Sequence, residues 1–176
     1  TSGVPRALKG TTIPFKYNDL ESLTSIIDNN EIGVIKMEVY RNSEPQNNFL
    51  QNVRKLATEN GIVLIFDECT SGFRETFGGL HKKYNVEPDI ALFSKALGNG
   101  YAISAITGRR SVMESAQSSF ISSTFWTERI GPSAALKALE VMEREQSWSY
   151  ITDLGLELIN CWKALAEKHH VPISIS

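Results

Sequence analysis

The fold of this chain is decided by three successive segments, GVIKMEV (residues 33–39), QNNFLQNVRKLATENG (46–61) and IVLIFDE (62–68). The middle segment places Phe49, Val53 and Ala57 on one face of a helix, and its Asn-Gly end is typical of a helix C-terminus. The flanking segments are short apolar runs, which favours buried strands. A strand, a helix and a second buried strand form a βαβ unit, so we expect parallel strands in an open α/β sheet covered on both faces.

Further elements extend this pattern on both sides. Before it, Leu20, Leu23 and Ile27 recur at helical spacing. After it, we expect two more strands and two helices at IALFS (90–94), AISAITG (102–108), GPSAALKALEVMERE (131–145) and an amphipathic stretch from about Trp148 to Lys168. No repeat or long linker interrupts the chain, and it opens on Thr1 rather than Met, so we expect one piece of a larger domain.

Composition limits the partners that the chain can have. Its 176 residues are 41% hydrophobic, enough for one sizeable core, and the formal net charge is -2. Without a basic excess we expect no nucleic acid and no membrane as partners, and a small-molecule substrate instead. No run approaches the roughly 18 to 20 apolar residues of a membrane span. Cys69 and Cys161 make no disulfide framework, and adjacent His169 and His170 diverge on a helix, so we expect a cytoplasmic protein without a metal site.

Two charged residues, Asp67 and Lys95, come at the ends of expected strands. In open parallel sheets, ligands bind beyond the carboxyl ends of the strands. One strand-to-strand excursion separates the two residues, so both side chains are expected to reach a single crevice. Each also has an ordinary explanation by itself, Asp67 as a turn or helix-capping aspartate and Lys95 as an exposed lysine at a helix start.

Two chemistries use an acid at the end of a buried strand. In a Walker-B strand, Asp67 would hold Mg²⁺ and Glu68 would orient water, but this needs a G-x-x-x-x-G-K-[ST] loop that the sequence lacks. In a pyridoxal-phosphate enzyme, a carboxylate keeps the pyridine nitrogen protonated while a lysine forms the Schiff base. Lys95 supplies that lysine in LFSKALGNG (92–100), where the glycines let the backbone approach a ligand closely.

Two longer stretches together are similar to a known family. They are VLIFDECTSGFRETFGGLHKKYNVEPDIALFSKALGNGYAISAITGRRSVM (63–113) and SSTFWTERIGPSAALKALE (122–140). They resemble the cofactor-binding part of the class III aminotransferases, the pyridoxal-phosphate enzymes that include glutamate-1-semialdehyde aminomutase. The βαβ unit and YNDLESL (17–23) upstream match in the same order, so the resemblance covers nearly the whole chain.

The resemblance implies roles for four residues. Asp67 matches the acid that pairs with the pyridine nitrogen of pyridoxal 5'-phosphate, and Lys95 matches the catalytic lysine that forms the internal aldimine. Cys69 stands where the family usually has valine or isoleucine packed on the cofactor ring, and a thiol is apolar enough to pack there. Thr124 matches the threonine that binds the cofactor phosphate of the neighbouring subunit, which implies a homodimer.

The same resemblance implies the fold, the domains and the reaction. The fold would be α/β, three-layer α/β/α with a mixed, mostly parallel sheet, the central part of the large domain of a fold-type-I pyridoxal-phosphate-dependent transferase. Residues 1–147 would belong to that cofactor-binding domain, and 148–176 would form a connecting helix toward a missing C-terminal small domain. The reaction would move an amino group between an amino donor and a carbonyl acceptor, or shift it internally. A P-loop-type ATPase fragment and a catalytically silent fragment with the same fold stay open as alternatives.

Overall fold

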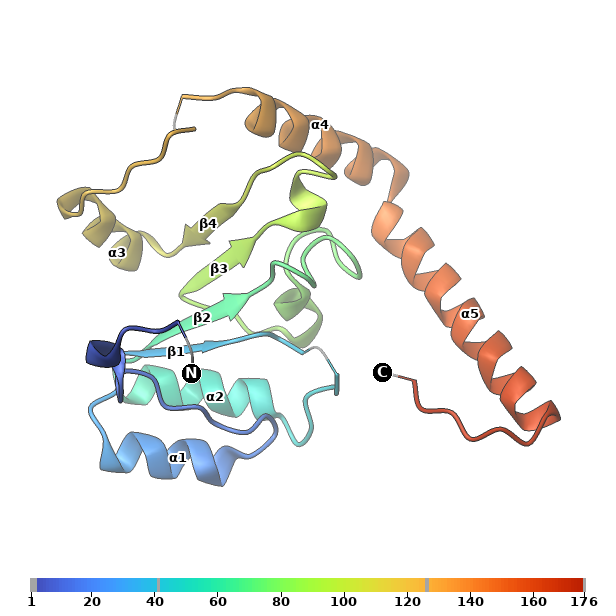
Figure 1. Ribbon diagram of the computed structural model, residues 1–176, viewed down its shortest axis with the longest axis horizontal. Coiled ribbons are helices and arrows are strands. Elements are labelled where there is room, and N and C mark those ends of the chain that lie inside the picture. The colour runs from blue at the N-terminus through green and yellow to red at the C-terminus, as the bar shows by residue number, and fades with distance from the viewer. Residues whose placement is uncertain (1–2, 41, 126, 176) are drawn as a thin grey trace.

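A four-stranded mixed sheet forms the centre of the computed structural model, which describes residues 3–40, 42–125 and 127–175. Its strands are β1 (Val34–Met37), β2 (Val63–Asp67), β3 (Ile90–Phe93) and β4 (Ala105–Gly108). They lie in the order β1-β2-β3-β4, with β1, β2 and β3 parallel and β4 antiparallel to β3 (Figure 1). The expectation of a mixed, mostly parallel sheet is therefore confirmed.

Helices connect and flank these strands. The α-helices are α1 (Leu20–Asn29), α2 (Phe49–Glu59), α3 (Arg110–Met113), α4 (Ile130–Glu145) and α5 (Ser147–Lys168), and the short 3-10 turns are η1 (Arg6–Leu8), η2 (Leu80–Tyr84), η3 (Lys95–Leu97) and η4 (Glu114–Ser118). The Asp19 side chain caps α1 by accepting a hydrogen bond from the Ser22 amide, as its residue type favours. Gly61 follows α2 with a positive φ of 65°, which stops the helix where the Asn-Gly pair predicts.

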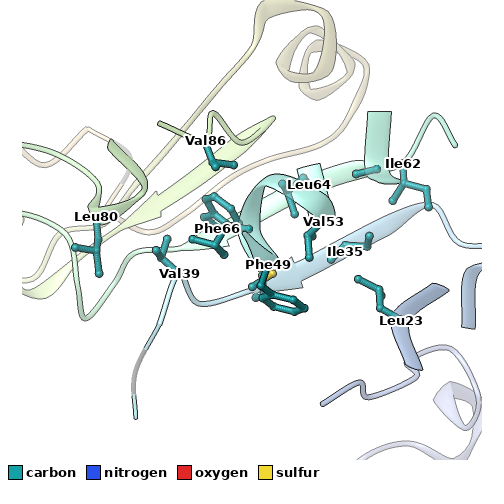
Figure 2. Packing of buried hydrophobic residues seen from close by; sticks show 13 residues of the cluster. Leu23, Ile35, Val39, Phe49, Val53, Ile62, Leu64, Phe66, Leu80 and Val86 are labelled. Carbon is teal, nitrogen blue, oxygen red and sulfur yellow. The ribbon is translucent and has the colours of Figure 1, made fainter. Parts of the chain in front are cut away.

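One face of the sheet carries the main core. Ile35 on β1 lies opposite Leu64 on β2, and both side chains are buried on this face. Helix α2 covers them with Phe49 and Val53, which are also buried (Figure 2). The predicted apolar stripe of α2 is therefore the stripe that the sheet buries.

A second, smaller cluster extends the same covered face over β3. The register aligns Phe66 with Ala91, so the buried residues of β2 and β3 point to the same side of the sheet. Ala91 and Phe93 pack there with Leu97 and with Ala135 of α4. Helices α2 and α4 thus pack against the same face of the sheet. Helix α1 packs beside α2 (Figure 1).

The opposite face of the sheet is more open. Met113 of α3 approaches its edge at Gly108. Val34 on β1 and Ile106 on β4 are exposed there, while Ile65 between them is half-buried. The described helices cover this face only at its edge, although the apolar run IVLIFDE favours strands covered on both faces.

Helix α5 projects away from the sheet (Figure 1). It follows α4 after Gln146, whose φ of 49° breaks the helical path one residue before Ser147. Trp148 anchors its first turn against Phe77, with ring centroids 5.3 Å apart. The break falls one residue before the expected end of the first domain at residue 147, and the assignment of 148–176 as a connection to another domain stays a prediction. Among the described residues, no helix has the combination of length and apolarity that crossing a membrane demands.

Candidate active site at the carboxyl ends of β2 and β3

Asp67 and Lys95 lie at the same edge of the sheet, as expected. Asp67 is the last residue of β2, and Lys95 opens η3 two residues after β3 ends. Because β2 and β3 are parallel and hydrogen-bonded neighbours, their carboxyl ends are adjacent. The backbone of Lys95 has a φ of 42°, a left-handed conformation that is uncommon for a non-glycine residue and often marks a functional position.

Thr70 holds the lysine side chain. The Lys95 Nζ donates a hydrogen bond of 2.6 Å to Thr70 Oγ1, although the residues are 25 positions apart. Lys95 is exposed overall, and this hydroxyl contact fixes the direction of its amine. Sequence analysis missed Thr70, since a Thr in a glycine-containing loop has no distinguishing signal.

Lys36 is a second residue that sequence analysis missed. Its Nζ lies 2.9 Å from Asp67 Oδ2. The Lys36 ammonium, by hydrogen bonding to this carboxylate, holds the pKa of Asp67 below its ordinary value, and the contact raises the pKa of Lys36 in turn. The only hint in the sequence is a lysine that interrupts the apolar segment GVIKMEV.

Cys69 opens the loop that follows Asp67. Its amide donates a hydrogen bond of 3.2 Å to Asp67 Oδ1, so the carboxylate orients the first turn of the loop. Burial raises the pKa of the Cys69 thiol, and Asp67 raises it further, while Lys95 and Lys36 act in the opposite sense. The half-buried thiol is therefore kept neutral, which suits a packing role rather than a nucleophilic one.

Thr124 is not joined to these residues. It lies exposed in a turn between η4 and α4. In the part of the chain that the structure describes, it makes none of the hydrogen bonds that link Asp67, Cys69, Thr70 and Lys95. Its expected action on a neighbouring subunit's site is not tested by one chain and stays a prediction.

Glu68, beside Asp67, has a different environment. Its side chain is fully buried and accepts hydrogen bonds from the His81 amide (3.0 Å) and from Ser71 Oγ, with His81 Nδ1 at 2.8 Å. Burial acts to raise the pKa of Glu68, but these donors outweigh it and lower the pKa below its ordinary value. A Cβ at Gly79 would overlap the His81 ring, so glycine is needed where the loop passes this pair.

A hollow of about 950 Å³ adjoins η3, between the loop after β3, α4 and α5. Its lining includes Arg74, Tyr101 and Arg129 but neither Asp67 nor Lys95. The candidate site is thus a strand-end surface rather than an enclosed cavity. Within the described ranges, no group of three His, Cys, Asp or Glu side chains is placed to hold a metal ion.

Comparison with known proteins defines the class. Residues 42–175 match the family model for aminotransferase class-III, so this chain belongs to the class-III aminotransferase family. It is 35% identical over 183 residues to the 3-aminobutyryl-CoA aminotransferase of Cloacimonas acidaminovorans, with 99% of this chain and 44% of that protein covered. The chain therefore spans less than half the length of this curated relative.

Solved structures share the fold. The pyridoxal-phosphate internal aldimine form of the FumI protein of Sphingopyxis sp. MTA144 matches with a TM-score of 0.90 at 24% identity, over 97% of this chain and 43% of that one. An omega-transaminase of Sphaerobacter thermophilus matches with a TM-score of 0.73 at 27% identity, over 81% of this chain and 35% of that one. These likenesses confirm the expected transferase fold.

Proposed function

We propose that the intact protein is a pyridoxal-phosphate-dependent enzyme that transfers an amino group between an amino donor and a carbonyl acceptor. The observation that carries this proposal is the placement of Asp67 and Lys95 at the adjacent carboxyl ends of β2 and β3 in a chain of the class-III aminotransferase family. Both a transferase and an internal aminomutase are compatible with this placement.

The donor set suits this cofactor. Asp67 offers a carboxylate for a protonated ring nitrogen, and Cys69 offers a half-buried apolar surface for the ring. Lys95 offers an amine, which Thr70 Oγ1 directs through its hydrogen bond. Asp67, Cys69 and Lys95 would hold the cofactor from this chain, and Thr124 would contribute to the neighbouring subunit's site in a homodimer.

Lys95, Asp67 and Thr70 would have different roles in the amino-group transfer. The bound cofactor would supply the carbon that exchanges the amino group and a ring that withdraws electrons from it. Lys95 would hold the cofactor covalently and then move a proton at the substrate carbon that bears the amino group. Asp67 would orient the ring and keep its nitrogen protonated. Thr70 would return the lysine amine to the same position after each proton transfer.

The ATPase alternative is weakened by Glu68. A Walker-B glutamate must reach a water molecule next to the nucleotide. Here the Glu68 carboxylate is fully buried and occupied by His81 and Ser71.

We further propose a cytoplasmic location, which the two free thiols of Cys69 and Cys161 support.

Reduction of the intact protein with borohydride tests the assignment. After loading with pyridoxal phosphate, peptide mass mapping is expected to locate the pyridoxyl group on the peptide that contains Lys95, and a Lys95→Ala variant should take up none. Lys82, on η2, is the internal control because it is an exposed lysine that donates a hydrogen bond to the Phe77 carbonyl instead. Label on Lys82, or no yellow colour and no label at all, would contradict the proposal and favour a silent protein.

A further inference from the structure

We propose that Lys36 is a positioning residue that tunes the cofactor's ring nitrogen through Asp67. The proposal rests on the function proposed above, because it concerns the acid that would face this nitrogen. Its starting point is the ion pair of 2.9 Å between Lys36 Nζ and Asp67 Oδ2.

The register of β1 and β2 brings the Lys36 and Asp67 side chains together. Lys36 on β1 lies opposite Ile65 on β2, so Asp67 is its diagonal neighbour two residues further along the partner strand. Diagonal neighbours on one face are within reach of long side chains. Lys36 alternates with the buried Ile35 and Met37, which directs it to the open face of the sheet together with Asp67.

The position is unusual for a lysine. On this face Lys36 lies beside two apolar residues, Val34 on its own strand and Ile65 on β2, while Glu38 follows two residues later along the chain. A lysine between apolar side chains makes this face of the sheet less apolar. The partner of Lys36 among the described residues is Asp67, the carboxylate of the candidate site. Glu38 and Cys69 also act on the charge of Lys36, but the hydrogen bond to Asp67 is the largest influence.

The electrostatic consequence has a definite sign. A carboxylate favours the protonated form of a nearby pyridine nitrogen because the two charges attract. A lysine that shares the same carboxylate offsets part of its negative charge. Lys36 therefore lowers the pKa of the ring nitrogen and weakens the hold of Asp67 on the cofactor. More than half of the Lys36 side chain is exposed (54%), so solvent reduces this effect without abolishing it.

The test uses the intact protein and pyridoxal phosphate isotopically labelled at the ring nitrogen. In Lys36→Met, we expect NMR titration of that nitrogen to move to higher pH by about one unit. The dissociation constant of the cofactor, measured by titrating the apoprotein, should fall by about three- to tenfold. Lys36→Arg keeps the positive charge and should restore the parent values of both quantities.

Two further variants separate this role from a structural one. Lys55→Met is the matched control, because Lys55 is an exposed lysine paired with Glu59 on α2 at 3.8 Å, and it should change neither quantity. In an Asp67→Asn background, Lys36→Met should lose its effect, because the carboxylate through which it acts is gone.

The outcomes distinguish the two proposals. If the parent binds the cofactor and Lys36→Met leaves both the nitrogen titration and the dissociation constant unchanged, the role of Lys36 is wrong while the function stands. An equal shift in the Asp67→Asn background would also overturn it. A parent protein that binds no pyridoxal phosphate overturns the function and the role of Lys36 together.

Discussion

At the scale of single residues, Asp89 connects more of the chain than either site residue. Its side chain is 1% exposed and lies just before β3. It accepts a hydrogen bond of 2.7 Å from the Leu64 amide on β2, pairs with Arg54 of α2 at 2.9 Å and contacts Arg109 at the end of β4. Burial acts to raise the pKa of Asp89, but the Leu64 amide and the two arginines lower it below its ordinary value. The Asp89 carboxylate thus joins α2 and β2 to the residues that adjoin β3 and β4.

Removing this carboxylate should destabilise the fold strongly. We expect Asp89→Ala to lower the free energy of unfolding by about 3 to 5 kcal/mol, because it leaves a partly buried guanidinium and a buried amide without their acceptor. Urea denaturation of the intact protein measures the loss. Asp28→Ala, on the exposed side of α1, is the control and should change stability by less than about 0.5 kcal/mol. An equal loss of unfolding free energy in the two variants would show that the contacts of Asp89 do not stabilise the fold.

At the scale of elements, periodicity and end signals predicted the helices and strands closely. The stripe of Phe49, Val53 and Ala57 is buried along α2, and the Asn-Gly pair ends that helix. The loop from Asp67 to η2 has no such periodicity, so its path could not be predicted. The path of this loop depends on the hydrogen bonds of the Glu68 carboxylate with Ser71 and with the backbone and side chain of His81.

The Glu68 contacts should make stability depend on pH. Its pKa in the folded chain lies below the ordinary value of 4.5, so its stabilising contribution is present above about pH 4.5 and is lost as pH falls through the folded pKa. Glu68→Gln should cost about 1 to 3 kcal/mol at neutral pH and should flatten the fall in stability on acidification. Denaturation curves recorded from neutral pH down to about pH 3 measure both effects.

A matched control isolates the buried pair from general acid unfolding. Glu59→Gln removes an exposed carboxylate at the end of α2 and should retain the full acid dependence of the parent. If Glu68→Gln followed the parent curve as closely as Glu59→Gln does, the buried Glu68 would not be linked to stability in this way.

At the scale of the whole molecule, the proposed homodimer predicts that exposed residues near Thr124 lie at an interface with a second subunit. Thr124 lies in an exposed turn, and the neighbouring Phe125 is 74% exposed. Helix α5 also exposes apolar side chains along its length, among them Leu156 and Trp162. Exposed apolar patches often mark surfaces that another chain covers, so the assembly stays a prediction that subunit mixing can test.

Mixing two inactive or weakened subunits tests this assembly. Thr124→Val should weaken cofactor binding by about ten- to a hundredfold, because a hydrogen bond to a charged phosphate contributes about 1.5 to 3 kcal/mol. In a heterodimer with Lys95→Ala, one site would carry both defects and the other neither. Activity at limiting cofactor should therefore return in part on mixing.

The control for the mixing experiment is Thr12→Val, an exposed substitution that leaves Lys95 and Thr124 unchanged. Thr12 lies in the N-terminal segment before α1, so this variant should bind the cofactor as the parent does. If heterodimers of Thr124→Val and Lys95→Ala form without any gain in activity, then Thr124 serves its own subunit's site or none.

The sequence by itself determined the elements and the edge of the sheet where the site lies. Apolar runs and helical stripes act locally, and parallel strands bring their carboxyl ends together, so the placement of Asp67 and Lys95 at one edge followed from order alone. Only the tertiary structure decided the partners of these residues. The pairs Lys36–Asp67 and Thr70–Lys95 depend on strand register and loop path, which arise from packing between segments far apart in the chain and leave no local pattern.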